Sequence, residues 1–291
     1  MAKKKPGLAA DYIHEPDPKV TARLMPFLEG LWKYYFRCSI SGFQNVPETP
    51  ALYVGNHNGL LTFEVLMLFY AWQQRFGGER QALGLAHDIV IKNPFFKWLL
   101  TPMGAVPARP DIADAALQDG YSLLVYPGGE KESFRPYSER AKVDFYGRKG
   151  FLKLALKNKV PIVPIVSIGA HESYIILDRG EGLAKALGLY DKIRLHGLPL
   201  TFRSIFFVWC LITGVFTFFP LLLAPWALLA TFIPLPAKMT FKILEPIDLD
   251  AHVDRSLSEE ENLESLYQLV LARIQETLSA EYAKRKLPIL G

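Results

Sequence analysis

Short runs of apolar, β-forming residues alternate along the middle of the chain with segments that have helical spacing. Strands that are apolar throughout are buried on both faces of a sheet, and helical crossovers between them favour parallel pairing. We therefore predict an α/β fold with a mixed, largely parallel sheet flanked by helices. The expected strands are residues 38–43, 51–54, 82–86, 121–126, 160–168 and 239–245.

Helix-start signals mark both ends of this region. Asp17-Pro18 opens a helix whose wide aromatic stripe fits either a membrane interface or packing on the protein's own core. Ser258 and Glu261 form a capping box that opens a C-terminal amphipathic helix. The chain then divides into a polar tail with an amphipathic helix at residues 1–37, a main domain at residues 38–255, and the C-terminal helix at residues 256–291.

The stretch from Ser204 to Ala237 carries no charged residue. Two complete membrane crossings would need about 40 residues, at roughly 20 per helix, which is more than the stretch holds. A single crossing would put the strand at residues 239–245 on the opposite side of the membrane from the other strands. Pro220 and Pro225 lie near the middle, so we expect residues 204–237 to form a membrane-embedded apolar hairpin that enters one leaflet and returns.

Charge and cysteine usage limit the partners and the compartment. A net charge of +4 suits an anionic membrane surface or a phosphate-bearing ligand, but it is too mild to indicate nucleic acid. Cys38 and Cys210 share no metal or redox spacing, and no metal cluster is visible. Residues 1–20 lack the apolar core of a signal peptide. We therefore expect a monotopic protein on the cytoplasmic face of a membrane, with its oligomeric state open.

His57 lies in a tight turn between the strand at residues 51–54 and a helix that Thr62 can cap. Open α/β sheets bind ligands at the carboxyl ends of their strands. Glu64 is the only carboxylate near His57 in the sequence, and a carboxylate that holds one ring nitrogen makes the other a better base toward a hydroxyl. The alternative is that His57 only caps the turn and Glu64 is an exposed helix residue.

Two further stretches carry polar groups at the ends of expected strands. Arg109 follows a short extended run and offers the paired donors that suit phosphate. Gly128 and Gly129 follow the next strand and can let backbone N–H groups approach an anion next to Lys131. The alternatives are a surface ion pair at Arg109 and a turn that merely needs positive φ at the glycines.

The order of these blocks resembles the glycerolipid acyltransferase superfamily, which includes lysophosphatidate and diacylglycerol acyltransferases. That superfamily has an Asn-His block followed by an acidic residue, a block ending in Arg, an aromatic-Pro-Glu-Gly turn, and an apolar strand with two prolines. The resemblance spans residues 40–250, and the matching positions are Asn56-His57 with Glu64, residues 104–109, residues 126–132, and Pro161 with Pro164.

Two departures from the superfamily pattern bear on the substrate. Phosphate-acceptor members have Asp where this chain has Thr62, and here the acidic residue comes two positions later. The third block reads Gly-Gly-Glu-Lys-Glu in place of Glu-Gly-Thr-Arg, which looks like the Pro-Gly-Gly branch that includes diacylglycerol and phytyl ester acyltransferases. A neutral lipid alcohol is therefore a candidate acceptor, in addition to a lysophospholipid.

The resemblance implies a membrane-bound O-acyltransferase that moves a fatty acyl group from acyl-CoA to a hydroxyl of a glycerolipid, with His57 as general base and Glu64 as its partner. Its partners would be acyl-CoA, the lipid acceptor and the bilayer, without a cofactor or a metal. Residues 38–255 would be the acyltransferase domain. The expected substrate- or phosphate-binding positions are Asn56, Arg109, Gly128, Gly129, Glu130, Lys131 and Glu132.

Two other functions stay open. A lipid esterase or thioesterase would use water in place of the alcohol, although the chain has no Gly-x-Ser-x-Gly elbow. A catalytically silent lipid-binding membrane protein would need only the apolar hairpin. Consumption of acyl-CoA with and without a lipid alcohol separates the three functions.

Overall fold

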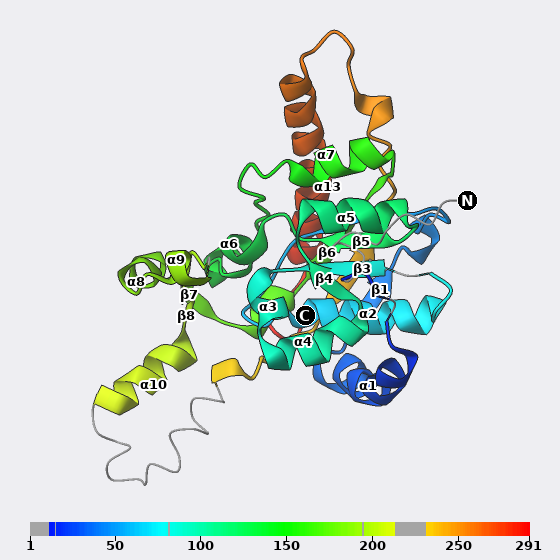
Figure 1. Cartoon of the computed structure of the whole chain (residues 1–291). Coiled ribbons are helices and arrows are strands. Elements are labelled where there is room, and N and C mark those ends of the chain that lie inside the picture. The colour runs from blue at the N-terminus through cyan, green and yellow to red at the C-terminus, as the bar shows by residue number, and fades with distance from the viewer. Residues whose placement is uncertain (1–11, 15, 81, 194, 213–230) are drawn as a thin grey trace.

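The structure, a computed structural model, describes residues 12–14, 16–80, 82–193, 195–212 and 231–291 (Figure 1). Its strands are β1 (Ser39–Ser41), β2 (Leu52–Gly55), β3 (Ala82–Ala86), β4 (Ala105–Pro107), β5 (Ser122–Val125), β6 (Ile162–Ile168), β7 (Ile176–Asp178), β8 (Leu200–Thr201) and β9 (Thr240–Ile243). In the described residues, a seven-stranded sheet has the order β1-β9-β6-β2-β5-β3-β4, and β7 and β8 form a separate pair. Every neighbouring pair in the large sheet is parallel except β6 and β9. The predicted mixed, largely parallel sheet is confirmed.

Helices cover both faces of the large sheet (Figure 1). They are α1 (Pro18–Gly30), α2 (Phe63–Phe76), α3 (Asp88–Lys92), α4 (Pro94–Leu100), α5 (Pro110–Gln118), α6 (Gly129–Ser133), α7 (Gly150–Asn158), α8 (Glu181–Ala186), α9 (Leu189–Ile193), α10 (Phe202–Ile212) and α13 (Glu259–Lys284). One hydrophobic core joins the sheet to α5, α7 and α13, and the other joins it to α1 and α2. Along β2, Leu52 and Val54 enter the first core and Tyr53 enters the second, so alternation along one strand supplies both layers.

The parallel strands β2, β5, β3 and β4 all end at one edge of the sheet. His57 follows β2, the Pro127 turn follows β5, and Arg109 follows β4. Neighbouring strands lie about 4.8 Å apart, so three strand spacings separate the end of β4 from the end of β2 by about 14 Å. The fold therefore brings the expected site segments to the same edge, but Arg109 to a different part of it.

The first helix starts and packs largely as the sequence indicates. Asp17 caps α1, because its carboxylate accepts the N–H groups of Lys19 and Val20. Leu28 of α1 and Phe36 beyond it are buried in the core, whereas Phe27 is 64% exposed. The aromatic stripe thus packs on the protein's own core along one side and reaches the surface along the other. The preceding residues 1–11 lie outside the described residues.

The two ends of the uncharged stretch come together in the fold. Arg203 donates a hydrogen bond of 2.6 Å to the carbonyl of Ile233, and β9 returns into the large sheet directly beside β6. The expectation that the strand after the stretch belongs to the same sheet is confirmed. The middle of the expected hairpin, residues 213–230, lies outside the described residues. Within the described ranges, no helix is long and apolar enough to cross a membrane.

Candidate active site

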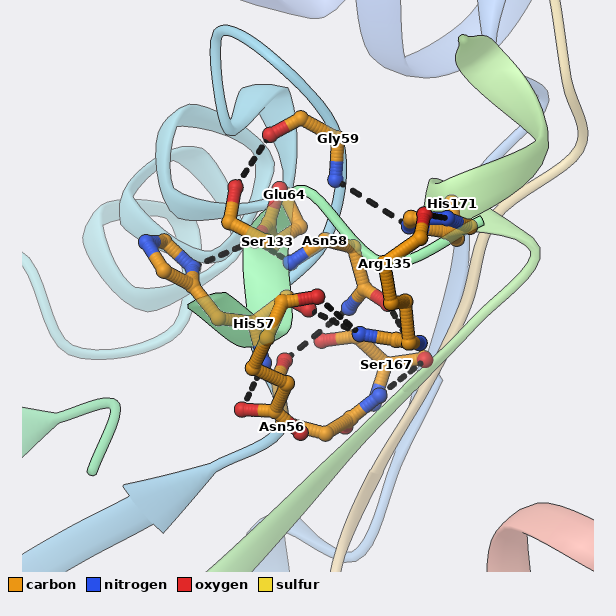
Figure 2. Close-up of polar contacts among 10 residues, drawn as sticks. Asn56, His57, Asn58, Gly59, Glu64, Ser133, Arg135, Ser167 and His171 are labelled. Atoms are coloured by element: carbon orange, nitrogen blue, oxygen red, sulfur yellow. Dashed lines mark hydrogen bonds and ion pairs between the residues drawn. The ribbon is translucent and has the colours of Figure 1, made fainter. Parts of the chain in front are cut away.

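His57 lies at the carboxyl end of β2, in a loop that turns directly into α2 (Figure 2). The loop is tight because Gly59 and Thr62 both adopt left-handed backbone angles, with φ of +73° and +46°. Thr62 occupies the position before α2, but its side chain caps no N–H group there, so the expected Thr62 cap is wrong. The first turn of α2 then places Glu64 beside the His57 ring.

The Glu64 carboxylate fixes the imidazole of His57 from one edge. Glu64 Oε1 lies 3.0 Å from His57 Nδ1 and also accepts the Asn58 N–H at 2.9 Å. The Glu64 side chain is 1% exposed, against 17% for that of His57. A carboxylate at Nδ1 favours the tautomer that carries its proton there and leaves Nε2 as the basic nitrogen. This arrangement can take a proton from a hydroxyl that approaches Nε2.

The backbone of His57 is held from both sides by two buried side chains, the carboxyl group of Glu132 and the guanidinium of Arg135, which we call the His57 clamp. Glu132 Oε2 accepts the His57 N–H at 3.0 Å, and Arg135 Nη1 donates to the His57 carbonyl at 2.6 Å. Arg135 Nη2 also donates to Asn58 Oδ1 at 2.6 Å. Glu132 and Arg135 are 0% and 2% exposed. The clamp therefore fixes the peptide that carries the candidate base.

The remaining N–H groups of the Arg135 guanidinium also have hydrogen-bond acceptors. It donates to the backbone carbonyls of Glu132 at 2.8 Å, Glu139 at 3.1 Å and Arg140 at 3.3 Å. Burial lowers the pKa of this guanidinium, and the nearby Glu132 opposes that shift. A buried cation is tolerated when its donors are satisfied and an opposite charge is near. Arg135 thus ties the His57 turn to the segment that follows α6.

The glycine turn after β5 packs against the clamp. A Cβ on Gly128 would lie 2.2 Å from Glu132 Oε2 and 2.7 Å from the Asp144 carbonyl, so only glycine fits there. Gly129 adopts a φ of +55°, and its N–H donates to the Tyr126 carbonyl at 3.0 Å. Of the expected substrate-binding positions, Gly128 therefore packs against Glu132, and Glu132 contacts the backbone of His57. Burial raises the pKa of the Glu132 carboxyl to about 8.

Two further buried side chains hold the loop around His57. Asn56, fully buried, exchanges two hydrogen bonds of 3.0 and 2.8 Å with the backbone of Ser167 in β6. His171 Nδ1 accepts the Gly59 N–H at 3.3 Å and its Nε2 donates to the Arg135 carbonyl at 2.8 Å, a tautomer inferred from these partners. Burial holds the pKa of His171 well below its usual range, so the ring is neutral. Figure 2 shows these contacts converging on the turn that carries His57.

The other expected phosphate-binding positions are engaged with neighbouring side chains. Arg109 pairs with Asp111 through contacts of 3.1 and 2.5 Å, and about half of each side chain is exposed. The Lys131 amine lies 5.9 Å from the centre of the Tyr146 ring.

Glu130 contacts the segment between α9 and β8. It forms a hydrogen bond with His196 and lies 4.0 Å from Arg148 Nη2. Glu130 therefore connects the segment between α9 and β8 to the turn after β5.

Sequence reasoning assigned no role at the site to four residues around His57: Asn58, Tyr126, Arg135 and His171. Tyr126 stacks on the imidazole, with ring centres 4.4 Å apart and an angle of 19° between the planes. Tyr126 is the first residue of the matched block at residues 126–132 and Asn58 adjoins the Asn56-His57 block, so position relative to the blocks is a usable signal. Arg135 and His171 lie in stretches with no motif, and only the folded chain brings them to His57.

Comparison with known proteins places the chain among acyltransferases. A family model described as Acyltransferase matches residues 37–168. An uncharacterized protein of Mycobacterium leprae is 32% identical over 228 residues, which cover 78% of this chain and 55% of that protein. A DGAT1/2-independent enzyme synthesizing storage lipids from Gallus gallus is 28% identical over 178 residues, which cover 61% of this chain and 51% of that enzyme. The chain spans about half the length of the curated relatives it matches.

A solved structure shares the fold. The crystal structure of the 1-acyl-sn-glycerophosphate (LPA) acyltransferase PlsC from Thermotoga maritima matches with a TM-score of 0.53. The match covers 92% of this chain and 84% of PlsC at 18% sequence identity. At that identity the likeness concerns the arrangement of the sheet and its flanking helices.

The buried Glu132 carboxyl should give the protein a distinctive pH dependence. Its pKa is raised from 4.5 to about 8, so the folded state binds this proton more tightly than the unfolded chain. Its contribution to stability therefore falls as pH rises through that window, by up to about 1.4 kcal/mol per pH unit. We expect Glu132→Gln to remove this decline, measured as thermal unfolding from pH 5 to 8. Glu79→Gln controls for loss of a surface carboxylate, and parallel stability curves for Glu132→Gln and wild type would contradict the assignment.

Proposed function

Because this chain belongs to the glycerolipid acyltransferase superfamily, we propose that it transfers a fatty acyl group from acyl-CoA to the hydroxyl of a neutral glycerolipid such as a diacylglycerol. The observation that carries the proposal is the 3.0 Å contact between Glu64 and His57 Nδ1 at the carboxyl edge of the sheet. It leaves Nε2 of a partly exposed histidine as a base.

In the proposed reaction, the acceptor hydroxyl gives its proton to His57 Nε2 while its oxygen attacks the thioester carbonyl. Glu64 stabilises the imidazolium that forms, as a carboxylate at Nδ1 does in hydrolase triads. Collapse of the tetrahedral intermediate breaks the carbon–sulfur bond, and the departing CoA sulfur takes the proton back from His57. The ester is the product, and the base is regenerated without a covalent enzyme intermediate.

The charges around His57 favour a neutral acceptor. In the described part of the chain, Arg135 is buried in the clamp and Lys131 lies over the Tyr146 ring. Arg148 donates to the carbonyls of the turn after β5. A phosphate monoester beside His57 would approach the Glu64 carboxylate, an unfavourable pairing of like charges. A lipid alcohol without a phosphate avoids that cost.

Arg109 is suited to a more distant group of the donor. It lies at the end of β4, about 14 Å along the sheet edge from the end of β2. CoA carries its phosphates at the far end of an extended arm from the thioester. A half-exposed guanidinium at that distance can contact them while the thioester lies at His57.

We also propose that α10 attaches the enzyme to the membrane that holds its lipid acceptor, with the stretch to residue 237 entering one leaflet. Phe202, Phe206 and Trp209 are spaced along one face of α10 and are 65%, 56% and 55% exposed. Figure 1 shows α10 projecting away from the sheet. An exposed aromatic face suits the interface of a bilayer. The bond between Arg203 and Ile233, at the two ends of the stretch, supports entry and return on one side, which we propose is the cytoplasmic face.

The proposed activity is tested with purified protein, labelled acyl-CoA and dispersed lipid acceptors. We expect wild-type protein to acylate diacylglycerol, and His57→Ala to lower the rate about 10²- to 10⁴-fold, the usual contribution of a general base. Glu64→Gln should retain more activity than His57→Ala. The matched control is His252→Ala, which removes an exposed histidine outside the site.

Three outcomes would contradict the proposal. Equal release of CoA with and without acceptor would identify a thioesterase. Preferred acylation of lysophosphatidate would refute the neutral acceptor. Wild-type turnover by folded His57→Ala would remove the mechanism.

The membrane attachment is tested by flotation with vesicles of phosphatidylcholine and phosphatidylglycerol. Phe206→Ser combined with Trp209→Ser should lower the floating fraction several-fold, because two exposed aromatic side chains are lost from the proposed interface. Val253→Ser combined with Leu257→Ser removes two exposed apolar side chains elsewhere and should not change it. Equal flotation of both double variants would show that α10 is not the attachment surface.

A further inference from the structure

Tyr126 directly follows β5, and its ring stacks on the imidazole of His57, the candidate base. Its ring centre is 4.4 Å from that of His57, and the planes differ by 19°. Gly55, at the end of β2, makes room for this ring, since a Cβ there would lie 2.8 Å from Tyr126 Cε1. The chain therefore keeps a glycine and an aromatic residue on adjacent strands where they frame the imidazole.

The ring face of Tyr126, and not its hydroxyl, makes the contact with His57. The hydroxyl is buried and has no hydrogen-bond partner within the described residues. Burial raises the pKa of the phenol, and the carboxylates of Glu64 and Glu132 raise it further, so the ring stays neutral. A neutral phenol and a phenyl ring present the same kind of electron-rich face to a neighbour.

Tyr126 and Glu64 constrain the imidazole in complementary ways. Glu64 contacts the ring edge at Nδ1, and Tyr126 covers one ring face, so the pair fixes both the direction of Nε2 and the plane of the ring. The face of an aromatic ring also attracts a cation placed over it. This attraction grows when His57 becomes an imidazolium, as it does when it accepts a proton from the acceptor hydroxyl.

We propose that Tyr126 is a positioning residue for acyl transfer, which orients the His57 ring through its aromatic face and stabilises the protonated form of that ring. The proposal rests on the proposed function, because it assigns His57 the role of base. The Tyr126 hydroxyl has no part in it. Phenylalanine at position 126 should therefore preserve the function of Tyr126, and leucine should not.

The test compares Tyr126→Phe and Tyr126→Leu with wild type by two readouts. The first is the pH dependence of kcat and kcat/KM for acyl transfer. The second is the titration midpoint of His57, followed by its C2 proton in the NMR spectrum and assigned with His57→Gln. Tyr121→Leu, at the other end of the same strand run, is the matched control for loss of a tyrosine from this region.

We expect Tyr126→Leu to lower kcat about 2- to 30-fold, the range for one cation–π contact. The acidic limb of the pH–rate profile and the titration midpoint of His57 should both move to lower pH. Tyr126→Phe and Tyr121→Leu should match wild type in both readouts. An unchanged His57 midpoint in Tyr126→Leu, or an equal shift in Tyr126→Phe, would overturn the proposal. A wild-type protein that transfers no acyl group would refute the proposed function instead, and the NMR midpoint would still decide whether Tyr126 stabilises the protonated ring.

Discussion

The clamp of Glu132 and Arg135 on the His57 peptide is the interaction on which the site depends. It joins the end of β2 to the segment after β5 through hydrogen bonds of 3.0 and 2.6 Å to opposite sides of one residue. Both side chains are buried, so leaving their polar atoms without hydrogen-bond partners would destabilise the fold. The buried positions of Glu132 and Arg135 are stable only when their hydrogen-bond partners are in place. A correctly formed His57 turn supplies these partners.

The sheet topology explains why so few residues suffice for this arrangement. β2 lies between β5 and β6, so the loops that follow all three strands converge on His57. The loop after β5 brings Tyr126 and the clamp, and the residues of β6 and the loop beyond it bring Ser167 and His171. Arg109 lies at the same edge of the sheet, three strands away, so in the proposed reaction it would contact a different part of a large substrate than His57 does. An elongated donor and a lipid acceptor fit such a layout better than a small compact substrate.

The sequence predicted the sheet, its mixed pairing and the strand after the uncharged stretch, because apolar β-forming runs are strong local signals. It also singled out His57 and Glu64, which the fold places 3.0 Å apart in spite of the lengthened gap between them. It could not find Arg135 or His171, since the residues of the His57 turn that they contact are 77 or more residues away in the chain. Its prediction that Gly128 contacts an anion stays a prediction, and it could not find the close approach of Glu132 to Gly128, because that packing constraint has no sequence signature.

The central claim is that the clamp holds His57 where its Nε2 can act as a base. The most direct measurement is the kinetics of acyl transfer by Arg135→Lys, which keeps the positive charge but loses the planar fork that reaches both His57 and Asn58. Because misplacing a catalytic group by about 1 Å can cost about 10²-fold, we expect kcat to fall by about that factor while KM for acyl-CoA changes little. A folded Arg135→Lys protein with wild-type kcat would contradict the account.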